Sequence, residues 1–141
     1  MIRIVVDTNV VVSGTLIDEG LPASILDLAA NKRVAMFVSP EIMAEYETVL
    51  RRPRFKIAPK RVDQVLSIIR RTSTLVKPAR RLSISRDESD NRFYECAEAG
   101  KVTFLITGNT KDFTINHKGT TIVTPREFIE RIGPNLAFRR R

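Results

Sequence analysis

Short apolar runs alternate with segments of helical periodicity along almost the whole chain, and this order constrains the fold most strongly. Residues 2–6 form an apolar run that we expect to be a strand covered on both faces. Further strands are predicted at residues 34–38, 74–76, 103–107 and 121–123, and helices at residues 21–30, 40–52, 61–71, 90–99 and 125–133. This alternation predicts an α/β domain with a parallel sheet and helices on both of its faces.

The ends of the predicted helices carry typical capping residues. Ser39 and Pro40 supply an N-cap and a first-turn proline. Residues 124–127 form a capping box, in which a threonine and a glutamate satisfy backbone N–H groups of the first turn. Gly100 and the pair at residues 133–134, Gly-Pro, are predicted to end the helices that precede them.

The 141-residue chain contains no linker or internal repeat, so we expect one domain over residues 1–135 and a basic C-terminal tail over residues 136–141. With 43% hydrophobic and 28% charged residues, it has the composition of a soluble globular protein. No apolar run approaches the roughly 18 residues needed to span a membrane, and the N-terminus lacks a secretory pattern, so a cytoplasmic location is predicted. One cysteine, Cys96, and one histidine, His117, are too few for an internal disulfide or for the usual zinc sites.

An acidic residue, Asp7, directly follows the first predicted strand. In a parallel sheet this strand delivers Asp7 to the carboxyl edge, where open α/β sheets bind ligands. The alternative interpretation is that Asp7, followed by Thr8 and Asn9, only forms a turn or caps a helix. Asn9 could orient the Asp7 carboxylate or could itself be a turn residue. A phosphatase with Asp7 as nucleophile is disfavoured, because phosphatases of the haloacid-dehalogenase type carry a second Asp where this chain has Asn9.

Two further acids lie on predicted helices at places that fit the same site. Glu45 borders an apolar face that includes Ile42 and Val49, and an acid beside a buried face needs a partner or a metal ion. Asp90 begins a predicted helix, just after a loop with three arginines. Each acid also has an ordinary alternative, Glu45 as a solvated surface residue and Asp90 as a helix cap.

A polar loop follows the predicted strand at residues 103–107, again at the carboxyl edge. Thr107 can donate a hydrogen bond to a neighbouring carboxylate. Asn109 and Asp112 compete for a fourth position in the site, and both also suit an ordinary loop. Three or four converging carboxylates repel one another unless a cation compensates them, and oxygen ligands alone indicate Mg²⁺ or Mn²⁺.

Positive charge is concentrated in the middle of the chain, whose net charge is +8. Residues 48–86 contain twelve arginines and lysines but only one acid, Asp63. Such a sector favours a nucleic-acid partner, although a solvated surface or an acidic protein partner would also fit. The residues expected to contact nucleic acid are Arg51, Arg52, Arg54, Arg80, Arg81 and Arg86. Beside an acidic metal site, this surface predicts the hydrolysis of phosphodiester bonds.

Four segments together resemble the PIN-domain family of metal-dependent ribonucleases, and most of all its VapC-like branch of bacterial and archaeal toxins. They are residues 5–10, 39–45, 87–91 and 104–109, and their order and spacing cover about residues 2–125. The resemblance implies a three-layer α/β/α fold with a central parallel sheet. It also implies that Asp7, Glu45 and Asp90 are the catalytic and metal-binding acids of a Mg²⁺- or Mn²⁺-dependent endoribonuclease that cleaves RNA.

The same resemblance implies the toxin of a toxin–antitoxin pair, which forms a homodimer and binds a cognate antitoxin protein. One position departs from the family, which usually has Thr-Gly-Asp where residues 107–109 are Thr-Gly-Asn. Asn109 offers an oxygen without negative charge, so we expect weaker metal binding unless Asp112 compensates. The alternative function is therefore a catalytically weakened or inactive PIN-like module that binds RNA or a protein partner.

Overall fold

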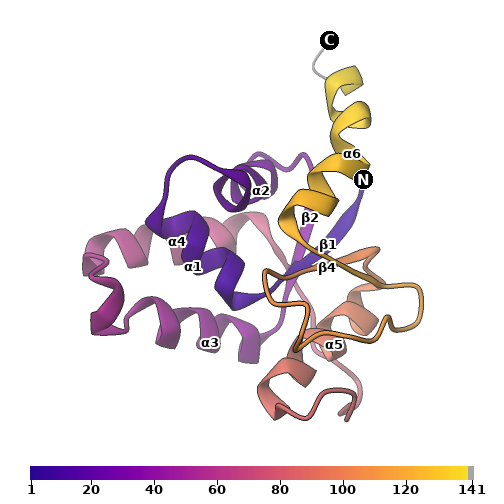
Figure 1. Ribbon diagram of the computed structural model, residues 1–141. Coiled ribbons are helices and arrows are strands. Elements are labelled where there is room, and N and C mark those ends of the chain that lie inside the picture. Colours follow the sequence, from indigo (N-terminus) through magenta and orange to yellow (C-terminus); the bar gives the residue numbers. More distant parts are fainter. Residues whose placement is uncertain (140–141) are drawn as a thin grey trace.

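The computed structural model describes residues 1–139 of the protein, and its centre is a sheet of five parallel strands (Figure 1). The strands are β1 (Arg3–Val6), β2 (Ala35–Val38), β3 (Thr74–Leu75), β4 (Phe104–Ile106) and β5 (Thr121–Val123), in the spatial order β3-β2-β1-β4-β5. The helices are α1 (Thr8–Leu16), α2 (Leu21–Ala30), α3 (Pro40–Leu50), the 3-10 helix η1 (Pro53–Phe55), α4 (Pro59–Thr72), α5 (Glu88–Gly100) and α6 (Pro125–Arg139). The predicted α/β class with a central parallel sheet is confirmed.

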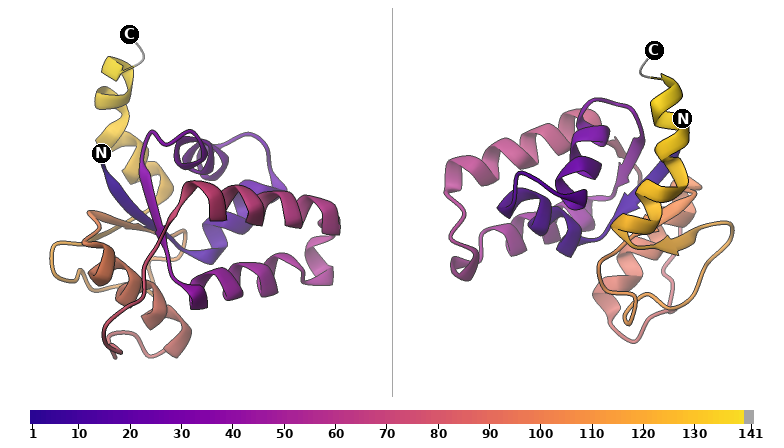
Figure 2. Two further views of the ribbon diagram at one scale, coloured as in Figure 1. Left: turned by 180° about the vertical axis from the view of Figure 1, so that it is seen from behind. Right: turned by 45° about the horizontal axis from the view of Figure 1, so that its top comes forward.

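The helices cover both faces of the sheet in the expected three-layer α/β/α arrangement (Figures 1 and 2). The chain first moves outward from β1 to β2 and β3 through helices α1 to α4, which pack on one another. It then returns through α5 to β4 on the other side of β1. Because crossovers between parallel strands are right-handed, this reversal puts α5 on the opposite face, where it contacts β1, β2 and β4. Helix α6 packs against β4, β5 and α2.

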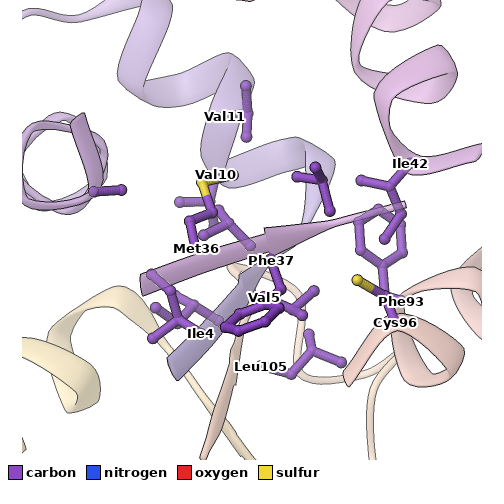
Figure 3. Packing of buried hydrophobic residues seen from close by; sticks show 14 of the residues in the cluster. Ile4, Val5, Val10, Val11, Met36, Phe37, Ile42, Phe93, Cys96 and Leu105 are labelled. Carbon is purple, nitrogen blue, oxygen red and sulfur yellow. The ribbon is translucent and has the colours of Figure 1, made fainter. Parts of the chain in front are cut away.

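The strands form the centre of the hydrophobic core. The residues of β1 at positions 4–6 are fully buried, as a strand covered on both faces requires. Figure 3 shows strand side chains packed together with Val10 of α1, Ile42 of α3 and Phe93 of α5. Helices on both faces of the sheet therefore pack on the same strands, which fixes the strand ends relative to one another.

Residues 8–16 form a helix, α1, that the sequence pattern does not predict. Its buried residues spread around more than half of the helix, so the segment lacks the alternation of an apolar and a polar face. The β-branched run at residues 10–12 also favours a strand. The helix forms because Asp7 caps its first turn and because α2 and α3 pack against it.

Two predicted helix starts are confirmed and a third is shifted. The Ser39 hydroxyl accepts a hydrogen bond of 3.2 Å from Ile42 N, and the capping box at residues 124–127 has both of its hydrogen bonds. Helix α5 begins earlier than predicted, because Asp87 instead of Asp90 is its N-cap. Asp90 therefore lies inside the first turn, and its side chain is free of the capping role.

The predicted helix ends need correction. Gly100 lies in the last turn of α5, and the left-handed residue is Lys101, with φ of 51°. Gly100 is required by packing instead, because a Cβ there would lie 2.8 Å from a ring carbon of Phe37. Helix α6 continues through residues 133–134 to Arg139, so the predicted end at Gly-Pro is wrong. A proline removes one main-chain hydrogen bond from a helix, but the turns on either side can remain helical.

The predicted boundary between a domain over residues 1–135 and a basic tail over residues 136–141 falls within α6. Residues 140 and 141 lie outside the described residues, so this division stays a prediction. Among the helices of residues 1–139, none combines the length and the apolar character that crossing a membrane requires.

Candidate functional site

The strand order reverses between β1 and β4, which are neighbours at the middle of the sheet. At such a point the connections leave the two strands toward opposite faces, so a crevice opens beyond their carboxyl ends. Asp7 follows β1 directly, and Thr107 follows β4. Because Val6 pairs with Ile106, these two residues lie side by side at the crevice.

The carboxylate of Asp7 is held by one donor at each oxygen. Its Oδ1 accepts a hydrogen bond of 2.8 Å from Thr8 N, and its Oδ2 accepts one of 2.8 Å from the Thr107 hydroxyl. Asp7 is buried, with 7% of its surface exposed. Burial raises the pKa of Asp7 to about 6, although both hydrogen bonds favour the ionised form. Asp7 is thus a helix cap, and it is also an acid that titrates near neutrality.

Glu45 reaches the same crevice from α3. It is partly buried, and the Thr8 hydroxyl donates a hydrogen bond to Glu45 Oε2. Thr8 therefore links Glu45 to Asp7, since its N–H binds one carboxylate and its hydroxyl binds the other. After burial and the two hydrogen bonds, the charge of Glu45 is the next contribution to the shifted pKa of Asp7.

Asp90 enters the site from the first turn of α5, and its Oδ2 lies 3.5 Å from the Ser85 hydroxyl. Burial raises the pKa of Asp90 to about 7, and the charge of Asp87 adds to this shift. The remaining contributions come from Asp7, Asp112 and Glu45. Glu45 and Asp112 each raise the pKa of both Asp7 and Asp90, and we call these four residues, Asp7, Glu45, Asp90 and Asp112, the acid cluster.

The loop after β4 separates the roles of Asn109 and Asp112. Asn109 Nδ2 donates a hydrogen bond of 2.6 Å to Asp112 Oδ2, whereas Asn109 Oδ1 accepts one of 3.2 Å from Lys111 N. Asn109 N also donates to the Thr107 hydroxyl at 3.0 Å. Asn109 therefore orients Asp112, and of the two residues it is Asp112 whose charge raises the pKa of Asp7 and Asp90.

The predicted supporting residues behave differently from each other. Thr107 binds Asp7 as expected, but Asn9 Oδ1 accepts a hydrogen bond of 3.2 Å from Gly108 N and so holds the loop after β4. Sequence reasoning missed two polar residues beside the acid cluster. Tyr46 donates a hydrogen bond to the carbonyl oxygen of Val6, and the Ser85 hydroxyl lies near Asp90. Neither stands in a pattern that would have indicated a site.

As the side chains stand, no group of three or more Asp, Glu, His or Cys residues within residues 1–139 is arranged to hold a metal ion. The carboxylate oxygens of the acid cluster instead accept hydrogen bonds from Thr8, Thr107, Ser85 and Asn109. His117 contacts Glu98, and Cys96 is buried in the core. An ionised carboxylate has about four lone-pair sites, so each acid of the cluster keeps acceptor sites for a cation beside these hydrogen bonds.

The predicted nucleic-acid residues divide into two groups. Arg51 forms ion pairs with Glu47 and Asp63. Arg80 likewise pairs with Glu98, and Arg81 pairs with Glu41 and Glu95. Arg52, Arg54 and Arg86 have no ion pair in the part of the chain that the structure describes. The sequence has only one acid within residues 48–86, so counting charges there overstated the unpaired positive charge. Acids of α3 and α5, which lie outside this stretch of sequence, form ion pairs with its arginines.

Comparison with known proteins gives matches of three kinds, to a family model, to a protein sequence and to a solved structure. A family model described as "PIN domain" matches residues 3–111. An uncharacterized protein of Methanocaldococcus jannaschii is 30% identical over an alignment 141 positions long, which covers 92% of this chain and 90% of the relative. The crystal structure of VapBC2 from Rickettsia felis, bound to a DNA fragment from their promoter, matches with a TM-score of 0.59 and 16% identity, over 87% of this chain and 98% of that chain. At that identity the structural likeness shows a shared fold.

Proposed function

The chain belongs to the PIN domain family, and on that premise we propose that it is a divalent-metal-dependent endoribonuclease that hydrolyses RNA phosphodiester bonds. PIN domains are generally nucleases, so a hydrolase is the expected class. The observation that carries the proposal is the acid cluster, whose members come from four segments remote in sequence and lie close enough at the crevice between β1 and β4 for Glu45 and Asp112 to raise the pKa of both Asp7 and Asp90.

The chemistry of the acid cluster fits a divalent cation with oxygen ligands. Burial is the first cause of the raised pKa values of Asp7 and Asp90, and the negative charges of neighbouring acids add to both shifts, at Asp90 that of Asp87 before those of the cluster. A doubly charged cation would offset this repulsion, and Mg²⁺ and Mn²⁺ are the ions that favour carboxylate and water ligands. Such an ion, when bound, supplies an acidified water and stabilises charge on the attacking and leaving oxygens of a phosphodiester.

Three members of the cluster, Asp7, Glu45 and Asp112, have a residue that fixes their orientation. In the proposed site Asp7, Glu45 and Asp90 hold the cation, with Asp112 as the fourth acid. Thr107 and Thr8 bind the carboxylates of Asp7 and Glu45, and Asn109 binds that of Asp112. These side chains act as positioning residues. The Ser85 hydroxyl lies 3.5 Å from both Asp90 Oδ2 and the carbonyl oxygen of Asp112, where it could donate to a phosphate oxygen.

A polyanionic substrate is supported by cations that no acid neutralises. Within residues 1–139, Arg52, Arg54 and Arg86 form no ion pair and are exposed, so their charge is available to phosphates. Arg51, Arg80 and Arg81 already bind acids, so we assign them a smaller part in RNA binding than the sequence indicates.

We extend the proposal to a toxin that forms a homodimer and binds a cognate antitoxin. Its support is the PIN domain family and the fold that the chain shares with VapBC2. Expression of the wild-type chain should arrest growth, and a short adjacent gene should relieve the arrest and yield a protein that co-purifies with this chain. Growth that continues normally during expression of the active wild-type enzyme would count against the toxin role.

The second candidate is a PIN-like module that binds RNA or a protein partner without cutting. It is favoured by the absence of a pre-arranged metal-binding group within residues 1–139 and by Asn109, whose oxygen accepts from Lys111 N. The two functions are separated by incubating the wild-type protein with defined RNAs in Mg²⁺, in Mn²⁺ and in EDTA. An endoribonuclease yields products of defined length with metal and none with EDTA. A binding module retains intact RNA in all three conditions, and high salt releases it.

A further inference from the structure

A cavity of about 470 Å³ lies between the loop that precedes α5 and the loop that follows β4. The first loop contributes residues 84–87, and the second contributes residues 111, 112, 114 and 115, with Tyr94 of α5 between them. The cavity adjoins the acid cluster, because Asp112 lines it and the lining residue Ser85 lies 3.5 Å from Asp90 Oδ2. A volume of this size is within the roughly 300–1,000 Å³ that is typical of small-ligand sites.

The cavity wall combines unpaired cations with an apolar surface. Arg86 and Lys111 come from opposite loops, both are exposed, and neither forms an ion pair among the residues that the structure describes. Asp87 also lines the cavity, but its Oδ1 accepts hydrogen bonds from Ser89 N and from the Ser89 hydroxyl. The apolar part is formed by Ile84 and by Ile115, which is 53% exposed.

Both loops are fastened to α5, so the cavity is formed before any ligand binds. Arg80 of the first loop donates two hydrogen bonds to Glu98, at 2.7 and 2.9 Å. His117 of the second loop contacts the same carboxylate at 3.0 Å. Glu95, which is buried, binds Arg81 of the first loop at 3.2 Å. Two neighbouring carboxylates of one helix therefore hold both walls.

We propose that this cavity is a subsite for one nucleotide of an RNA substrate, next to the phosphodiester that lies at the acid cluster. Arg86 and Lys111 bind the phosphate of this nucleotide through charge-assisted hydrogen bonds, and Ile84 and Ile115 contact its base. The subsite rests on the proposed function, since it gives that function a way to position the strand. It also makes Arg86 a phosphate-binding residue. Arg51, Arg80 and Arg81 do not share this role, because acids already bind them.

The test measures binding without cleavage. An end-labelled, single-stranded oligoribonucleotide is titrated with the wild-type protein in EDTA, and the Kd is read from fluorescence anisotropy. Arg86→Ala and Lys111→Ala should each weaken binding about tenfold, the loss of a charge-assisted hydrogen bond. Each should also lower the slope of log affinity against log salt by about 0.7. Arg86→Lys should retain most of the affinity.

Arg71→Ala is the matched control, because Arg71 is an exposed cation without an ion pair within residues 1–139 and lies at the end of α4, before β3. It should leave the Kd almost unchanged. A 5′-mononucleotide should displace the oligoribonucleotide more strongly than inorganic phosphate does, and Ile115→Ala should reduce this difference. If Arg86→Ala and Lys111→Ala bind as tightly as Arg71→Ala, the subsite is wrong, whether or not the wild type cleaves RNA. If both variants lose affinity and the wild type never cleaves with metal, the subsite stands and the nuclease proposal fails.

Discussion

The Thr107 hydroxyl donates a hydrogen bond of 2.8 Å to Asp7 Oδ2, and the two residues are 100 positions apart in the chain. They meet because β1 and β4 are parallel neighbours whose last residues, Val6 and Ile106, are paired. The bond is buried and favours the ionised form of Asp7 against the cost of burial. A single contact thus couples the sheet register to the protonation of the candidate site.

Replacing Thr107 by valine should raise the pKa of Asp7 further, because one of its two hydrogen bonds is lost while the side-chain volume is kept. Loss of a hydrogen bond to a charged group corresponds to roughly one pKa unit or more. The pH at which Mn²⁺ binding reaches half of its maximum should therefore move upward by about one unit. Thr107→Ser, which retains the hydroxyl, should behave as the wild type does. Equal midpoints for all three proteins would separate Asp7 from metal binding.

Asp7→Asn should stabilise the metal-free protein above about pH 6. The pKa of Asp7 is raised from 3.8 in the unfolded chain to about 6 in the fold, so between these values the folded state keeps a proton that the unfolded state releases. The free energy of unfolding of the wild type therefore falls relative to the variant as pH rises from about 4 to about 6, by about 3 kcal/mol in total. Urea unfolding of both proteins in EDTA at several pH values measures the difference.

The same pair of proteins responds to metal in the opposite sense. Mn²⁺ should raise the melting temperature of the wild type more than that of Asp7→Asn, because ligand binding stabilises only a protein that retains the site. Asp18→Asn, an exposed aspartate in the loop after α1, should respond as the wild type does. Identical shifts in all three proteins would show that Asp7 is not part of a cation site.

Much of the fold follows from the sequence because a parallel sheet is built from apolar runs separated by helices. Helix α2 has the predicted bounds, and β5 does too, since a first-turn proline, Pro22, and the apolar runs mark them clearly. Helix α1 escapes prediction because its buried residues spread around the helix, and its stability comes from packing with α2 and α3. Hydrophobic periodicity indicates a helix only where one face of the helix is exposed to solvent and the other is buried.

Asn109 and Asp112 show where sequence reasoning about the site stops. The sequence places both after β4, but it cannot assign the hydrogen bond from Asn109 Nδ2 to Asp112 Oδ2. We expect Asp112→Asn to lower RNA cleavage roughly a hundredfold and Asn109→Ala only about tenfold, the effect of losing an orienting residue. Initial rates at saturating Mn²⁺ provide the comparison. A larger loss for Asn109→Ala than for Asp112→Asn would give the fourth position to Asn109.

Sequence alone also could not predict which arginines are free to bind RNA, because ion pairs join residues that are distant in sequence. Arg81 contacts Glu41 at 2.8 Å and Glu95 at 3.2 Å, and neither acid lies in the basic sector. A count along the sequence includes every charged residue, whereas RNA binding depends on the cations that remain unpaired after folding. Only the assembled structure leaves Arg86 distinct from Arg80 and Arg81.

Glu95→Ala should destabilise the protein by about 3 kcal/mol, because it leaves the ion-pair partners Arg81 and Arg92 without a buried carboxylate. Glu41→Ala is the control, since Glu41 is exposed and binds the same Arg81, and its loss should cost less than about 1 kcal/mol. Chemical denaturation at pH 7 measures both values. A small effect of Glu95→Ala would mean that the loop before α5 is not fastened through this residue.

The most direct measurement is the digestion of defined RNAs by the wild type, Asp7→Asn and Asp18→Asn, purified in parallel and assayed with Mn²⁺ and with EDTA. We expect equal, metal-dependent product ladders from the wild type and Asp18→Asn, and intact RNA with folded Asp7→Asn. The same ladder from Asp7→Asn as from the wild type would contradict this expectation, because the cutting would then not depend on the carboxylate at the end of β1.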